Sequence, residues 1–213
     1  MEPFKKERGI IATLDRANVD TDQIIAKQFL KSIKRTGFGE FLFYDWAHKP
    51  DESLDPDFEL NQPRFANARI LVARNNFGCG SSREHAVWAV AQAGYRTVIA
   101  PRKGSGADSI PAFADIFANN AVKNGLLTIE LSEAEVDQLF AIAATGESIE
   151  ATVDLPAQKL IVHSDPEVTI AFDISPAVKE HLLKGLDDIG LTLQQEQSIT
   201  DFEAKHDTQI AAG

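Results

Sequence analysis

The sequence predicts an α/β fold with a partly parallel central sheet, flanking helices and additional antiparallel strands. Between residues 68 and 131, short apolar runs alternate with segments of helical character. Strands and helices that alternate in this way are typical of parallel βαβ units with right-handed crossovers. Beyond residue 147, three further runs resemble antiparallel strands. The expected strands are residues 8–14, 68–73, 97–100, 126–131, 148–154, 159–163 and 168–172. The expected helices are residues 82–93, 113–124, 132 to about 146, and 175–184.

The ends of several helices are marked by capping residues. Ser132 and Glu135 have the spacing of a capping box, in which each side chain bonds the other residue's backbone N–H. Ser175 followed by Pro176 is the expected pair at a helix start, and Gly125 and Gly185 stand where glycine commonly ends a helix. These signals fix the order of the elements.

Composition and charge restrict the class of protein. The chain has 213 residues, 44% of them apolar, which suffices for one substantial core. We expect a single domain spanning residues 1–213, with its core at about 8–185, a helical extension near 194–205 and a tail. The formal net charge of −11 argues against nucleic acid or an anionic membrane as a partner. No apolar h-region or long apolar run is present, so a cytoplasmic protein is expected.

Cys79 is the chain's one cysteine. A disulfide within the chain is therefore excluded, and a lone thiolate cannot ligate an iron–sulfur cluster. The histidines lack the spacing of metal ligands, so no metal site is expected on this chain.

One run, Asn75-Asn-Phe-Gly-Cys-Gly-Ser-Ser-Arg-Glu-His85, carries the chemistry. It follows an expected buried strand and opens an expected helix. Its two glycines allow a tight turn and close approach to a ligand. Unpaired N–H groups at a helix start, beside Ser81, Ser82 and Arg83, favour a carboxylate or phosphate.

Simpler interpretations of this run are available. Ser81 and Glu84 have capping-box spacing, so Ser81 could merely cap a helix while Arg83 is a solvated cation. A Walker loop is excluded because no Gly-Lys-Ser/Thr follows. The dinucleotide-binding fingerprint is excluded because Arg83 stands where its third glycine belongs.

Several ordered motifs resemble one family. Phe77-Gly-Cys-Gly-Ser-Ser-Arg-Glu-His-Ala86 resembles the signature of the aconitase swivelling domain and of the small subunits of 3-isopropylmalate dehydratase. Asn18–Ile25 is similar to the first turn of that family, and Lys27–Trp46 to its bacterial isopropylmalate form. Phe113-Ala-Asp-Ile-Phe117 and Lys123-Asn-Gly-Leu-Leu127 extend the resemblance, which covers most of residues 8–131.

The resemblance implies a swivelling β/β/α domain and a hydro-lyase subunit of leucine biosynthesis. Such a subunit isomerises 2-isopropylmalate to 3-isopropylmalate by dehydration and rehydration. Two alternatives stay open at this stage. The chain could be the small subunit of a related hydro-lyase acting on citraconate/methylmalate, homoaconitate or dimethylmalate, or a non-catalytic module that retains the fold.

The resemblance also assigns roles to residues. Ser81 matches the base that removes a proton beside a substrate carboxylate, and Ser82 and Arg83 match substrate-binding residues. Asp22 matches an active-site aspartate, and Arg35 is a candidate second carboxylate clamp. The specificity loop is expected to contain Lys31, Ile33 and Lys34.

The expected partners follow from the same resemblance. No cofactor is expected on this chain, because in this family a [4Fe-4S] cluster is held by the cysteines of a large subunit. The expected partners are that large subunit and a small hydroxy-dicarboxylate substrate, with no nucleic acid and no membrane.

Two features depart from the family pattern. Ala26 stands where members usually have proline, and residues Arg102–Ala112 form an insertion before Phe113. Such an insertion is typical of a flexible surface loop, which costs little stability. Because it follows a strand expected to be parallel to the one before Ser81, we expect it at the same edge as the site.

Overall fold

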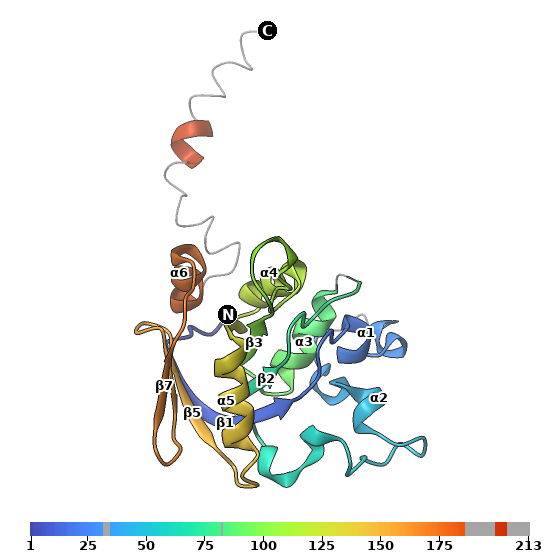
Figure 1. The fold of residues 1–213 in the computed structure, drawn as a ribbon. Helices are drawn as coiled ribbons and strands as arrows, with labels where there is room; N and C mark the ends of the chain where they lie inside the picture. Colours follow the sequence, from blue (N-terminus) through green and yellow to red (C-terminus); the bar gives the residue numbers. More distant parts are fainter. Residues whose placement is uncertain (32–34, 82, 186–198, 204–213) are drawn as a thin grey trace.

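A computed structural model describes residues 1–213 except 32–34, 82, 186–198 and 204–213 (Figure 1). Its centre is one seven-stranded sheet in the order β4-β3-β2-β1-β5-β6-β7. The strands are β1 (Lys6–Leu14), β2 (Ile70–Ala73), β3 (Thr97–Arg102), β4 (Leu127–Ser132), β5 (Glu150–Asp154), β6 (Lys159–Val162) and β7 (Val168–Ala171).

Strand β1 divides the sheet into two halves of different character. On one side it pairs parallel with β2, and β2, β3 and β4 continue in parallel. On the other side it pairs antiparallel with β5, and β6 and β7 continue in antiparallel fashion. The predicted partly parallel sheet with additional antiparallel strands is thereby confirmed.

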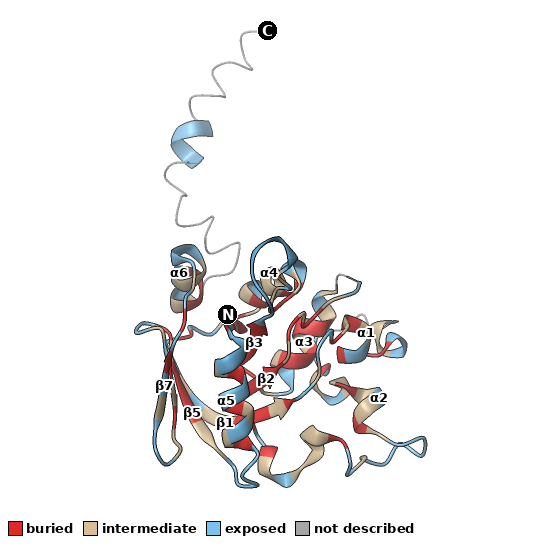
Figure 2. Ribbon diagram, viewed as in Figure 1, coloured by how far each residue is buried: buried red, intermediate tan, exposed pale blue. Residues whose placement is uncertain are grey.

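Both faces of the parallel half are covered, which explains its continuous apolar runs. In β2 all four residues are buried, and they alternate between two cores. Ile70 and Val72 face a cluster that includes residues of α5 (Glu133–Ala143) and α6 (Pro176–Lys184). Leu71 and Ala73 face a cluster built with α3 (Glu84–Gln92) and α4 (Asp115–Lys123). Figure 2 shows the buried residues concentrated along the strands and inner helix faces.

The predicted caps of two helices are confirmed. Ser132 and Glu135 form the capping box at the start of α5, and the Ser175 side chain caps α6 with Pro176 in its first turn. Gly185 ends α6 in the left-handed conformation, at φ 64°. Residues 199–203 are helical and exposed. Among the described residues, no helix has the length and apolarity that a membrane crossing requires.

Short helices fill the connections of the parallel half. The segment between β1 and β2 contains α1 (Thr21–Ile24), η1 (Lys27–Lys31), η2 (Gly39–Phe41), α2 (Tyr44–Ala47), η3 (Glu59–Asn61) and η4 (Pro63–Phe65). They bring an aromatic group onto the sheet face that α3 also covers, with Phe38, Phe43, Phe58 and Phe65 all buried.

The insertion is more ordered at its end than a free surface loop would be. Its tip is exposed and includes η5 (Gly106–Asp108), and Lys103 and Ile110 exchange two backbone hydrogen bonds at its base. Ala112, in contrast, is fully buried, and the Phe77 N–H donates to its carbonyl at 2.9 Å. The end of the insertion therefore lies beside the signature run, at the edge where it was expected (Figure 1).

Candidate functional site

The signature turn, residues 78–83, requires its two glycines. Gly78 has φ 76°, and a Cβ there would lie 2.3 Å from the Phe117 ring of α4. Gly80 has φ 86°, and a Cβ there would lie 2.0 Å from the Asp20 carboxylate. Both positions combine a left-handed backbone with a contact that no side chain could tolerate. The turn is therefore closely packed between α4 and the segment before α1.

A short parallel ladder fastens the turn to that segment. The Cys79 N–H donates to the Val19 carbonyl at 3.2 Å, and the Thr21 N–H donates to the Cys79 carbonyl at 2.9 Å. The Thr21 hydroxyl then donates to the Ser81 carbonyl at 2.6 Å. Three bonds therefore hold the main chain around Ser81.

Asp22 connects the first turn to Arg83. Its Oδ1 lies 2.5 Å from Arg83 Nη1, and its Oδ2 lies 3.0 Å from Lys27 Nζ. The Asp22 Oδ1 and Arg83 Nη1 atoms are buried, and neither has a further hydrogen-bond partner among the described residues. The arrangement places the Asp22 carboxylate between two cations.

The structure corrects the predicted start of the helix after Ser81. Helix α3 begins at Glu84 rather than Ser82, and its N-cap is Arg83, which has an extended backbone at φ −136° and makes no side-chain cap. Ser81 is exposed and does not cap the helix. The capping-box interpretation of Ser81 and Glu84 is wrong, because the left-handed Gly80 turns the chain and delays the helix.

A cavity of about 220 Å³ lies between the turn and the first turn of α4. The lining residues are Thr21, Gly78, Gly80, Arg83, Ala114, Asp115, Ile116 and Phe117. Its walls thus combine the Arg83 guanidinium with the exposed apolar side chain of Ile116. Such a mixture suits a small anion with an apolar part.

Cys79 is half-buried, and the pKa of its thiol is raised by burial and then by the nearby Asp20 carboxylate. A thiol that resists ionisation is a poor metal ligand. Within the described part of the chain, no three His, Cys, Asp or Glu side chains come together as a possible metal site.

Arg35 lies away from the Asp22–Arg83 pair. Its guanidinium stands over the Trp88 ring, 5.8 Å from the centroid, and its carbonyl accepts from Gln92 Nε2 at 2.8 Å. Gln92 Oε1 also accepts from the Phe38 N–H at 2.9 Å, so the end of α3 holds both sides of this bend. His85 packs against Phe38 and Trp88, which is the packing role that its sequence position favours.

The remaining expected site residues are described in part. Ser82, Ile33 and Lys34 lie outside the described residues, and Lys31 is the last residue of η1. Thr21 and Lys27 contact the site but were not predicted. Asp20 and Gln23 form a capping box at α1, and that spacing could have indicated that Asp20-Thr-Asp22 opens a helix at the site.

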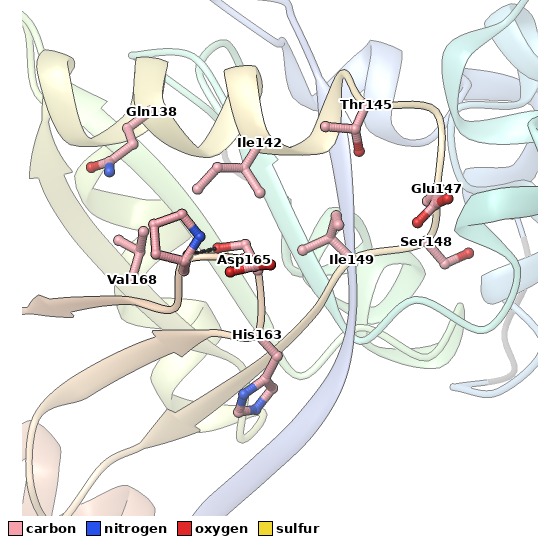
Figure 3. A pocket seen from close by; sticks show the side chains of 11 residues that line it. Gln138, Ile142, Thr145, Glu147, Ser148, Ile149, His163, Asp165 and Val168 are labelled. Carbon is pink, nitrogen blue, oxygen red and sulfur yellow. Dashed lines mark hydrogen bonds between the residues drawn. The ribbon is translucent and has the colours of Figure 1, made fainter.

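A larger cavity, of about 810 Å³, lies elsewhere in the molecule (Figure 3). It is bounded by the end of α5, the chain that leads into β5 and the turn between β6 and β7. Gln138 and Ile142 project from α5, while His163 lies on the opposite side. His163 Nε2 is bonded to the Thr152 hydroxyl at 2.8 Å. The polar groups around this groove do not converge on one point.

Comparisons with known proteins agree with the fold. Residues 1–134 match the aconitase C-terminal domain, and residues 188–209 match the C-terminal domain of 3-isopropylmalate dehydratase small subunits. The solved 3-isopropylmalate dehydratase of Methanocaldococcus jannaschii shares the fold, with a TM-score of 0.62 at 23% identity. The alignment covers 93% of this chain and 99% of that one. The class is therefore that of aconitase-type domains.

A close relative narrows the class further. The 3-isopropylmalate dehydratase small subunit of Desulforapulum autotrophicum is 56% identical over 208 residues, which are 98% of this chain and 97% of the relative. The chain belongs to the family of 3-isopropylmalate dehydratase small subunits, hydro-lyases of leucine biosynthesis within the aconitase superfamily.

Proposed function

We propose that this chain supplies the proton-transfer and substrate-binding side of an enzyme that interconverts 2-isopropylmalate and 3-isopropylmalate. The observation that carries the proposal is the fixed turn in which Ser81 and Arg83 stand two residues apart and Asp22 holds Arg83. Family membership supplies the reaction class, and the geometry of this chain supports the roles of its residues.

Ser81 acts as the base in dehydration. Its ionised Oγ takes the proton from the carbon beside a substrate carboxylate, and the C–H electron pair forms the C=C bond. The hydroxyl on the neighbouring carbon leaves with its bonding electrons and takes up a proton from solvent to become water. In rehydration, water adds back across the C=C bond in the opposite orientation, so that the hydroxyl and the proton have exchanged carbons. A serine is a weak base, so nearby cations and N–H donors must favour its ionised form. Arg83 and Lys27, which flank Asp22, supply positive charge near the turn.

Arg83 binds a carboxylate of the substrate. Asp22 fixes one side of its guanidinium, which leaves the other N–H groups directed outward in their planar fork. Ser82 is proposed as a further substrate ligand. Arg35, held over Trp88, is proposed to reach the second carboxylate when the site closes, because it does not touch the Asp22–Arg83 pair in the free chain.

The site requires a partner to be complete. Ser81 is exposed, whereas a serine base needs an environment from which water is excluded. The partner is proposed to be a large subunit with a [4Fe-4S] cluster, because Cys79 alone cannot hold one. When bound in that subunit, the cluster supplies a Lewis acid for the leaving hydroxyl. We place this assembly in the cytoplasm.

Substrate selection is proposed to depend on the loop from Lys31 to Gly39. The malate-like core is common to the substrates of related hydro-lyases, so Ser81 and Arg83 cannot distinguish their side groups. The loop combines Ile33 with Lys34 and Arg35 and is fastened to α3 through Gln92. Isopropylmalate is the substrate that family membership favours over citraconate/methylmalate, homoaconitate and dimethylmalate.

The test compares the chain alone, the chain with its large subunit, and the assembly carrying Ser81→Ala. The chain alone should show no isomerisation. The assembly should be active, and Ser81→Ala should lower kcat on the order of a hundredfold or more. Its melting temperature should stay unchanged, because Ser81 caps no helix.

Substantial activity without a large subunit would exclude the proposed division of roles. Wild-type kcat in Ser81→Ala would show that another group is the base. A panel of hydroxy-dicarboxylates, compared by kcat/KM, distinguishes isopropylmalate from the related substrates.

A further inference from the structure

Thr21, the first residue of α1, lies where this segment is hydrogen-bonded to the signature turn. Thr21 is buried, with only 2% of its surface exposed. Its N–H donates to the Cys79 carbonyl at 2.9 Å, and its hydroxyl donates to the Ser81 carbonyl at 2.6 Å. One residue therefore holds the main chain on both sides of Gly80.

The hydroxyl replaces a backbone bond that the fold cannot make. The ladder between residues 19–21 and 78–79 is parallel, and its next acceptor would be the Ser81 carbonyl. The Gln23 N–H, which would be the matching donor, instead bonds Asp20 at the start of α1. Gly80, at φ 86°, also turns the chain away. Without a backbone donor from the ladder, the Ser81 carbonyl takes its hydrogen bond from the Thr21 hydroxyl instead.

We propose that Thr21 is a positioning residue that sets the orientation of Ser81 for proton transfer; the inference rests on the proposed role of Ser81 as base. With its carbonyl held from one side and Gly80 closed against Asp20, Ser81 has little freedom to rotate about its own backbone. The direction of the Ser81 Cα–Cβ bond is thereby set before substrate binds. A displacement of a reacting group by roughly 1 Å can lower the rate of the chemical step by about a hundredfold.

Thr21 itself does not act on the substrate. Thr21 borders the 220 Å³ cavity but is only 2% exposed, and its hydroxyl donates its proton to the Ser81 carbonyl, so it has no proton to donate to a substrate. Thr21 is also β-branched, so its χ1 has few accessible rotamers and the hydroxyl is held where the carbonyl needs it.

The experiment uses the chain assembled with its large subunit and compares wild type, Thr21→Val and Thr21→Ser. Valine keeps the shape and removes the hydroxyl, and serine restores the hydroxyl. We expect Thr21→Val to lower kcat roughly 10- to 100-fold with KM within about twofold of wild type. Thr21→Ser should recover kcat to within about fivefold of wild type.

A deuterium isotope effect separates positioning from loss of folded enzyme. With substrate deuterated at the carbon that loses the proton, Thr21→Val should show a larger isotope effect on kcat than wild type, because proton transfer becomes more limiting. A smaller amount of active enzyme would lower the rate and leave the isotope effect unchanged. That second result, or an unchanged kcat, would overturn the proposal.

Matched variants keep the outcomes distinct. Thr152→Val removes a comparably buried hydroxyl that bonds His163, so it should affect stability without changing the isotope effect. If Thr21→Val does not assemble, Thr21→Ala carries the same expectation, and failure of both to assemble would overturn the proposal. Ser81→Ala, measured in parallel, tests the base itself. If Ser81→Ala is fully active, Ser81 is not the base, and the proposed function is contradicted independently of the result for Thr21.

Discussion

The two halves of the sheet carry cavities of opposite kinds. The antiparallel half borders the larger one, about 810 Å³, whose polar side chains are spread around its rim or bonded to neighbours, as His163 is to Thr152. The parallel half borders one of about 220 Å³, which is lined by the left-handed Gly78 and Gly80 and by Arg83, the partner of Asp22. Backbone constraint and converging charge, rather than volume, distinguish the proposed site from the larger cavity.

Two glycines test whether the parallel half is under tighter steric constraint. Gly80→Ala should lower the free energy of unfolding by about 2–3 kcal/mol, from the left-handed backbone and from displacement of the Asp20 cap. Gly146→Ala, at φ 91° with no atom within 4 Å of its Cβ, should lose only about 1–2 kcal/mol. Denaturant unfolding measures both. In the assembled enzyme, Gly80→Ala should also abolish most activity, and Gly146→Ala should retain it. Equal effects would remove the distinction between the halves.

Asp22 and Glu7 each pair with two cations, so variants of the two residues test whether charge beside the signature turn contributes to substrate binding. Asp22→Asn should raise KM roughly tenfold, because Arg83 loses a charged partner. Glu7, which pairs with Arg69 and Arg96 beside the starts of β2 and β3, provides the control. Glu7→Gln should leave KM unchanged, and each variant should lose less than about 1 kcal/mol of stability. A lower KM in Asp22→Asn would show that Asp22 competes with the substrate for Arg83.

The smallest effect is expected in the large groove. Gln138 is exposed on its α5 wall, and Glu147 lies on its other side (Figure 3). Replacing both by alanine should leave kcat/KM and the affinity for the large subunit within about twofold of wild type, since surface changes of this kind are usually small. Steady-state kinetics and a binding titration check the result. A loss beyond about tenfold in either quantity would give this groove a function.

The sequence predicted the order of strands and helices because those elements depend on local patterns. Ser132, Ser175 and Gly185 marked helix ends correctly, since each acts on backbone groups within a few residues. The same local rule failed at Ser81. There, the spacing to Glu84 was right, but Gly80 changes the chain direction one residue earlier, and the helix begins only after the extended Arg83.

Contacts between distant segments explain what sequence patterns missed. The Thr21 hydroxyl bonds a carbonyl 60 residues further along the chain, and no local pattern reports that distance. The insertion looked polar and flexible, yet Ala112 is buried because its carbonyl completes a backbone pair with Phe77. In each case, the hydrogen-bond partner belongs to a segment that is distant in sequence and becomes a neighbour only in the folded chain.

Helix α3 connects the two parts of the proposed site. Arg83 precedes its first residue, and Gln92, its last, holds the main chain at Arg35 and Phe38. A nine-residue helix spans roughly 13 Å and is stiff over that length. We therefore expect that Ile33 and Lys34 can be exchanged among relatives while the proposed anion-binding end keeps its geometry. A lineage could acquire a new side-group preference by altering a few loop positions, without rebuilding the proton-transfer apparatus.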